Sequence, residues 1–122
     1  MSFASRYRSR MKDTLFVLRP GFDDGGTSYF CPYCAQVIGY LAYFPEVRDT
    51  LDIVELDFPR PRHRLIELLG EEHQSAPKLV LGEGAKDVPG VEISEAKGRR
   101  FIASTLPILR YLAVTRGTSI PH

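Results

Sequence analysis

The chain contains two cysteines, Cys31 and Cys34, and only a proline and a tyrosine separate them. Beyond Pro32, apolar residues recur at helical spacing, which places Cys34 on the same helix face as Val37 and Leu41. Proline suits the first position of a helix, because its missing N–H would have no intrahelical partner there. The pattern therefore predicts Cys31 as the residue that caps a helix and Cys34 as an inward-facing residue one turn later.

Two cysteines at this spacing can bring their sulfurs within bonding reach. The unpaired amides and the dipole at a helix N-terminus favour a thiolate, so we predict Cys31 as a nucleophile. Cys34 faces the core, where it is protected and can attack only a disulfide already formed on Cys31. Pro32 and Tyr33 complete this predicted redox motif, and Cys31 and Cys34 are its catalytic pair.

Two other interpretations of the cysteine pair stay open. Zinc often binds paired cysteines but prefers four ligands, and the chain has no second cysteine pair. The histidines His63, His73 and His122 are not spaced as a partner set, so no metal site is predicted. The pair could also fill space in the core without any chemistry.

The composition is that of one soluble domain. The chain has 122 residues, of which 43% are hydrophobic and 25% charged, and its net charge is +1. Because this charge creates no global field, neither nucleic acid nor a membrane is an expected partner. The cysteine count favours a reducing cytoplasm, and the composition leaves the oligomeric state undetermined.

The N-terminal segment is basic and lacks the apolar run of a signal peptide or membrane span. We expect residues 1–11 to form a flexible tail and residues 118–122 to form a short C-terminal tail. A single domain is expected over residues 12–117.

Hydrophobic periodicity and turn residues divide that domain into strands and helices. The expected order is βαβαββα, an α/β fold whose four-stranded mixed sheet is flanked by helices. Strands are expected at 15–18, 51–58, 79–81 and 100–103, helices at 32–44, 61–69 and 105–116, a loop at 21–29 and a long hairpin connection at 82–99.

The element order, the segment from Phe30 to Cys34 and the Ala76–Pro77 pair together resemble the thioredoxin superfamily. Within it, the resemblance is to glutaredoxins and to the N-terminal domains of glutathione transferases. The chain looks most like a group of small, uncharacterised thioredoxin-fold proteins that carry this Cys-Pro-x-Cys signature. The resemblance implies a cis-proline at Pro77 beside the nucleophile.

The same resemblance implies a ligand groove. The residue before the cis-proline, Ala76, would offer its backbone to an extended thiol ligand. The segment that begins at Ser104 and Thr105 resembles a helix start that holds the glutamyl carboxylate of glutathione. Equally, either hydroxyl could do no more than cap the helix.

Aromatic residues surround the cysteine pair. Tyr29, Phe30 and Tyr33 could pack against a bound peptide or thiol cofactor. The alternative, that these rings only cover the core, is favoured for Phe30. The predicted ligand groove consists of Tyr29, Phe30, Ala76, Pro77, Ser104 and Thr105.

The expected function is that of a glutaredoxin-like thiol-disulfide oxidoreductase acting on protein or small-molecule thiols and disulfides. No tightly bound cofactor is expected, and glutathione is a candidate reductant or ligand. The alternatives are a noncatalytic interaction module with the same fold and a structural zinc-binding protein.

Overall fold

The computed structural model describes residues 11–122, so residues 1–10 of the predicted N-terminal tail lie outside the described residues. The chain folds as an α/β domain with a mixed five-stranded sheet and a separate two-stranded hairpin. In chain order the elements are β1 (Asp13–Leu18), β2 (Phe22–Asp24), β3 (Thr27–Tyr29), α2 (Pro32–Tyr43), α3 (Pro45–Arg48), β4 (Leu51–Leu56), α4 (His63–Leu69), β5 (Lys78–Val80), β6 (Glu92–Ile93), β7 (Arg100–Ala103) and α5 (Thr105–Arg116).

The strands of the large sheet lie in the order β4-β1-β5-β7-β6. The first strand, β1, runs parallel to β4 and antiparallel to β5, so that Leu15 lies opposite Ile53 on one side and Leu79 on the other. The remaining pairs, β5 with β7 and β7 with β6, are antiparallel. The sheet is therefore mixed, as the sequence indicated.

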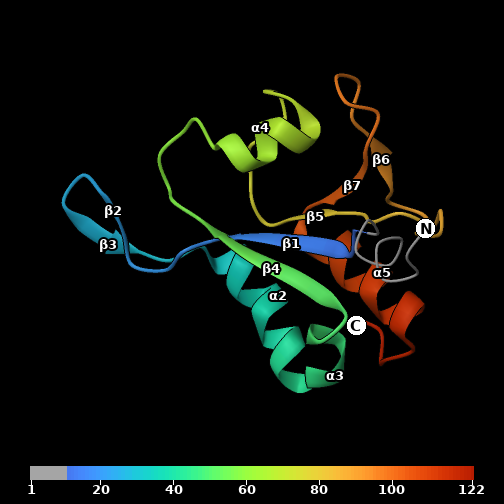
Figure 1. Ribbon diagram of the computed structural model, residues 1–122. Coiled ribbons are helices and arrows are strands. Elements are labelled where there is room, and N and C mark those ends of the chain that lie inside the picture. Colours follow the sequence, from blue (N-terminus) through green and yellow to red (C-terminus); the bar gives the residue numbers. More distant parts are fainter. Residues whose placement is uncertain (1–10) are drawn as a thin grey trace, which may run out of the picture.

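Helices cover both faces of this sheet (Figure 1). Alternate residues of β1 point to opposite faces, as the pleat of a strand requires. Leu15 and Val17 pack in the cluster that also contains residues of α2 and α5. Phe16 packs with Leu65 and Leu69 of α4. The protein thus has three layers with a separate hydrophobic cluster on each side of the sheet.

The predicted loop at 21–29 is a β-hairpin in the structure, and it extends away from the sheet (Figure 1). Gly25 and Gly26 both have positive φ, +64° and +90°. Two such residues in succession form the turn that joins antiparallel strands with the correct twist. The Asp-Gly-Gly-Thr sequence is therefore a hairpin signal that the prediction missed.

The structure also differs from the prediction at β6, at the start of α4 and at Pro45. The sheet has five strands rather than four, because the connection expected at 82–99 contributes β6. Helix α4 begins at His63, and Pro61, expected in its first turn, precedes it with a cis peptide bond. Pro45 ends α2 as expected, but it also starts the short helix α3.

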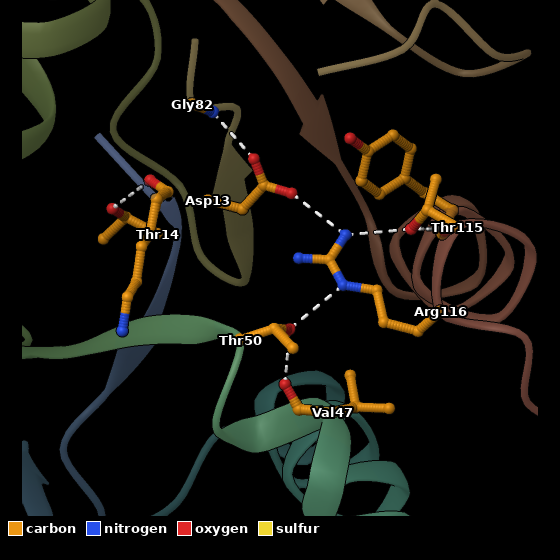
Figure 2. Close-up of polar contacts among 9 residues, drawn as sticks. Asp13, Thr14, Val47, Thr50, Gly82, Thr115 and Arg116 are labelled. Atoms are coloured by element: carbon orange, nitrogen blue, oxygen red, sulfur yellow. Dashed lines mark hydrogen bonds and ion pairs between the residues drawn. The ribbon is translucent and has the colours of Figure 1, made fainter. Parts of the chain in front are cut away.

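A network of polar contacts closes one end of the sheet (Figure 2). One carboxylate oxygen of Asp13 accepts a hydrogen bond from the Gly82 amide at 2.7 Å, and the other lies 3.1 Å from the guanidinium of Arg116. Arg116 also donates to Thr50 at 3.0 Å. Asp13 begins β1, whereas the cysteines lie near the other end of that strand, so this network is separate from them.

Candidate active site

Cys31 is the N-cap residue of α2 and Pro32 occupies the first turn. The Cys31 sulfur accepts a hydrogen bond from the Cys34 amide, with 3.2 Å between nitrogen and sulfur. This is the contact by which a capping side chain satisfies an otherwise unpaired helical amide.

Cys34 lies beneath Cys31 in the hydrophobic cluster and is only 3% exposed. Its sulfur accepts a hydrogen bond from the Leu18 amide at the end of β1, at 3.4 Å. Burial, reinforced by the neighbouring Cys31, raises the pKa of the Cys34 thiol to about 12. Both cysteines are free thiols. Cys34 therefore stays protonated at neutral pH.

A cavity of about 730 Å³ opens onto both cysteines, and Phe30 lies beside them in its wall. Most of the other side chains in the wall are apolar and come from β1, α2 and β4. The charged side chains that line it, Arg19, Arg48 and Glu55, were not predicted as site residues.

Arg19 and Glu55, which both line this first cavity, form an ion pair at 3.6 Å. Arg19 also pairs with Asp57. A sequence signal for this arrangement exists in retrospect: Arg19 follows one strand directly, and the acidic residues lie in and after the strand that pairs with it.

A second cavity, of about 600 Å³, lies on the other side of the start of α2. Except for Tyr29, it contains the predicted groove residues that the first cavity lacks, and the Ala76–Pro77 peptide bond in its wall is cis. The hydroxyl of Thr105 donates a hydrogen bond to the carbonyl oxygen of Tyr33 at 3.2 Å, which ties α5 to α2. The residues of the predicted site that line this cavity are Tyr33, Ala76, Pro77, Ser104 and Thr105.

Neither hydroxyl at the start of α5 caps the helix. Ser104 occupies the N-cap position, but its side chain makes no capping hydrogen bond, and the Thr105 hydroxyl is engaged with Tyr33. Ser104 has a φ of +78°, a conformation that side-chain-bearing residues rarely adopt. The expectation of a simple serine or threonine cap is therefore wrong.

The aromatic residues near the cysteines are exposed. Phe30 is 61% exposed and Tyr33 is 63% exposed, so the interpretation that Phe30 covers the core is wrong. Tyr29 lies on β3 with its ring centroid 6.1 Å from that of Phe22, and it lines neither of the two cavities. Of the two aromatic residues in the predicted groove, Phe30 thus adjoins a cavity at the site and Tyr29 does not, while Tyr33 of the predicted redox motif lines the second cavity.

Arg62, which the sequence did not mark, is buried close to the cysteines. Its guanidinium donates to the carbonyl oxygens of Phe58, at 3.2 Å, and Gln74, at 2.8 Å. Burial lowers the pKa of Arg62, and its positive charge slightly offsets the raised pKa of Cys34. The guanidinium therefore holds the chain segment that leads to Ala76 while adding positive potential near the thiols.

No group of three or more histidine, cysteine or acidic side chains within residues 11–122 is arranged to hold a metal ion. The zinc interpretation consequently has only the two cysteines as ligands in the described part of the chain. Among the same residues, no helix has both the length and the apolar character needed to span a membrane.

A protein-family model described as "Protein of unknown function (DUF3088)" matches residues 12–120. The comparison with curated proteins gives no match. The comparison with solved structures gives none either.

Proposed function

The chain belongs to the DUF3088 family, whose description carries no activity, and we propose from the site itself that the protein is a thiol-disulfide oxidoreductase. The observation that carries this proposal is the pairing of Cys31, whose sulfur caps α2 by accepting a hydrogen bond from the Cys34 amide, with the buried Cys34 one turn behind it. The two thiols share one cavity but have different surroundings, which suits one to attack and the other to resolve.

The proposed reaction is a two-electron exchange. The Cys31 thiolate attacks one sulfur of a substrate disulfide, forms a mixed disulfide and releases the other substrate sulfur as a thiolate, which takes up a proton. Cys34 then loses its proton and attacks the Cys31 sulfur, which releases the second substrate thiol. The substrate is reduced, the Cys31–Cys34 pair is oxidised, and an external thiol such as glutathione or a dithiol returns the two electrons.

We also infer that the fold is of the thioredoxin type. The elements β1, α2, β4, α4, β5, β7 and α5 follow one another in the βαβαββα order, and β6, α3 and the β2–β3 hairpin are additions to it. The cis-proline directly before β5 supports the same inference. A reducing compartment such as the cytoplasm would keep both cysteines available as thiols for this cycle.

Trapping tests the proposed function. With Cys34→Ser, the mixed disulfide on Cys31 cannot be resolved, so we expect substrate proteins to stay covalently bound until a strong reductant is added. Cys31→Ser is the matched control and should trap nothing. The wild-type protein should reduce hydroxyethyl disulfide with dithiothreitol as electron donor. Absence of both trapping and turnover would refute the proposal.

The exposed aromatic rings favour a second candidate, a noncatalytic interaction module. Phe30 and Tyr33 together present a large apolar surface at the start of α2. For such a module, replacing both cysteines by serine would leave partner binding and cellular function unchanged. For the oxidoreductase, the double replacement abolishes function, so this one comparison separates the candidates.

A further inference from the structure

As far as residues 11–122 line it, the second cavity differs from the first in having no charged side chain in its wall. Its lining consists of apolar residues together with the uncharged polar residues Gln36, Ser75, Ser104 and Thr105 and the ring of Tyr33. The cavity on the cysteine side, in contrast, contains two arginines and a glutamate. An unhydrated charge in an uncharged, largely apolar groove is costly unless it is paired.

The groove offers little to an anionic ligand. Glutathione carries two carboxylates, which proteins usually bind with arginine, lysine or free amides. At the start of α5, Pro107 has no N–H to donate, and the Ile108 amide already bonds the Ser104 carbonyl. The Thr105 hydroxyl is directed to the Tyr33 carbonyl. The amides of Thr105 and Leu106 are the two at this helix start that have no backbone acceptor among the described residues, so it can bind at most one of the two carboxylates, and no cationic side chain in the described lining pairs with the second.

The same groove suits an apolar side chain. Leu106 is 43% exposed although it is a leucine, and Pro77 and Leu109 lie in the same wall. Ala76 makes no backbone hydrogen bond with another residue of the described chain, so its N–H and C=O are available to an extended peptide. A polypeptide that pairs with Ala76 would place the side chain next to its cysteine against this apolar wall.

We propose that the substrates are polypeptide disulfides in which an uncharged, apolar residue adjoins the attacked cysteine, and that glutathione mixed disulfides are poor substrates. This inference rests on the proposed oxidoreductase function and assigns substrate selection to the second cavity. Leu106 determines specificity in this assignment by its contact with the substrate side chain.

The test compares substrates that differ in charge. Two synthetic peptides, identical except for leucine or glutamate beside a single cysteine, are each prepared as a mixed disulfide with 2-mercaptoethanol. The glutathione mixed disulfide of 2-mercaptoethanol is the third substrate, and dithiothreitol supplies the electrons. We expect kcat/KM to be about tenfold higher for the leucine peptide than for either anionic substrate, the scale of discrimination typical of apolar pockets.

Adding a cation to the groove should reverse this preference. Leu106→Lys, and independently Gln36→Lys from α2, should lower kcat/KM for the leucine peptide and raise it for the glutamate peptide. Val114→Lys is the matched control, since Val114 lies on the same helix as Leu106, is 64% exposed and lines neither cavity at the cysteine site. This control should keep the wild-type ratio.

The outcomes separate the inference from the function on which it rests. If hydroxyethyl disulfide is reduced but the two peptides react equally, or the glutathione disulfide reacts fastest, the substrate assignment is overturned and the oxidoreductase function stands. If no disulfide is reduced, hydroxyethyl disulfide included, both are overturned.

Discussion

Cys34 owes its raised pKa to where it lies rather than to its residue type. Because the pKa is about 12 in the folded protein, against an ordinary value of 9.0, the thiol stays protonated over the working range of most enzymes. In the proposed reaction, Cys34 would therefore act only after Cys31 has formed a disulfide, and both its burial and its protonation would limit this resolving step.

We expect iodoacetamide to alkylate Cys31 alone in the native protein at pH 8. Cys34 should react only when guanidinium chloride unfolds the chain, and the mass of intact protein distinguishes one adduct from two. Cys31→Ser should give no adduct under native conditions. Rapid double labelling of the native protein would contradict the buried position of Cys34.

The same pKa links Cys34 to the stability of the fold. A pKa raised on folding means that the folded state retains its proton at pH values where the unfolded state has lost it. The contribution of protonated Cys34 to the free energy of unfolding is therefore complete below about pH 9 and is lost as the pH rises toward about 12. The stability of Cys34→Ser should lack this alkaline decline.

Lys78 is a buried cation, and burial shifts its pKa in the direction opposite to that of Cys34. It is 2% exposed, its ammonium group donates to the Ser75 hydroxyl at 3.2 Å, and it lies over the ring of Phe101. Burial lowers its pKa to about 8. Carrying this charge at neutral pH therefore costs folding free energy.

We expect Lys78→Met to stabilise the protein at pH 7 by about 1–3 kcal/mol, because it removes a buried charge and keeps the side-chain volume. In the wild type, Lys78 of the unfolded chain holds its proton between pH 8 and 10.5, whereas Lys78 of the folded protein has lost it. The free energy of unfolding therefore increases with pH over that range. The difference between wild-type and variant unfolding free energies should consequently shrink as the pH rises. A constant difference would contradict the assignment.

At the scale of elements, the end of β5 is fixed by its approach to the start of β1. A Cβ atom on Gly82 would lie 2.0 Å from the Met11 carbonyl oxygen, a distance that no real Cβ contact shows. The Gly82 amide also donates to Asp13. Glycine is required here by the close contact of two backbones.

Gly82→Ala should therefore destabilise the protein by about 1–3 kcal/mol, because one backbone segment must move. The midpoint of urea unfolding measures the effect. Gly39→Ala is the control: an added Cβ there meets no atom within 4 Å, and alanine favours the interior of α2. The control should be neutral or slightly stabilising.

The β2–β3 hairpin precedes the cysteine motif in the chain but lines neither of the two cavities at the site. The ring of Phe22, in β2, stacks on the ring of Phe58 with the two centroids 4.3 Å apart. The backbone carbonyl of Phe58 in turn accepts hydrogen bonds from the guanidinium of Arg62. The hairpin is thereby anchored beside the segment that leads to α4. Its last residue, Tyr29, is separated from Cys31 only by the exposed Phe30.

At the scale of the whole molecule, the ion pair between Asp13 and Arg116 joins the start of β1 to the C-terminal end of α5 (Figure 2). Their side chains are only 9% and 17% exposed, so removal of either leaves a poorly solvated charge. Breaking such a pair costs much more than breaking an exposed one.

We expect Asp13→Ala to lower the free energy of unfolding by about 2–4 kcal/mol, since both Arg116 and the Gly82 amide lose an acceptor. Chemical denaturation provides the measurement. Glu55→Ala, which removes one of the two exposed carboxylates that pair with Arg19, serves as the control and should have a much smaller effect. Equal losses from the two variants would contradict this account.

The α/β class, the mixed sheet and several individual elements could be predicted from local patterns alone. A short apolar run marks strand β1, apolar residues at helical spacing mark α2, and Pro32 identifies the start of that helix. The strands that were missed, β6 and those of the β2–β3 hairpin, are short and mostly exposed. Their existence depends on backbone pairing with a neighbouring strand, which leaves little hydrophobic periodicity.

The sequence by itself determined that Cys31 would begin a helix and that Cys34 would face the core, because both follow from local geometry and spacing. Only the tertiary structure decided that the cysteines and Ala76–Pro77 line separate cavities, and that Arg62 lies near the thiols. Cavities form between elements far apart in the chain, so the side chains that meet there, and the charge they carry, depend on how the layers pack.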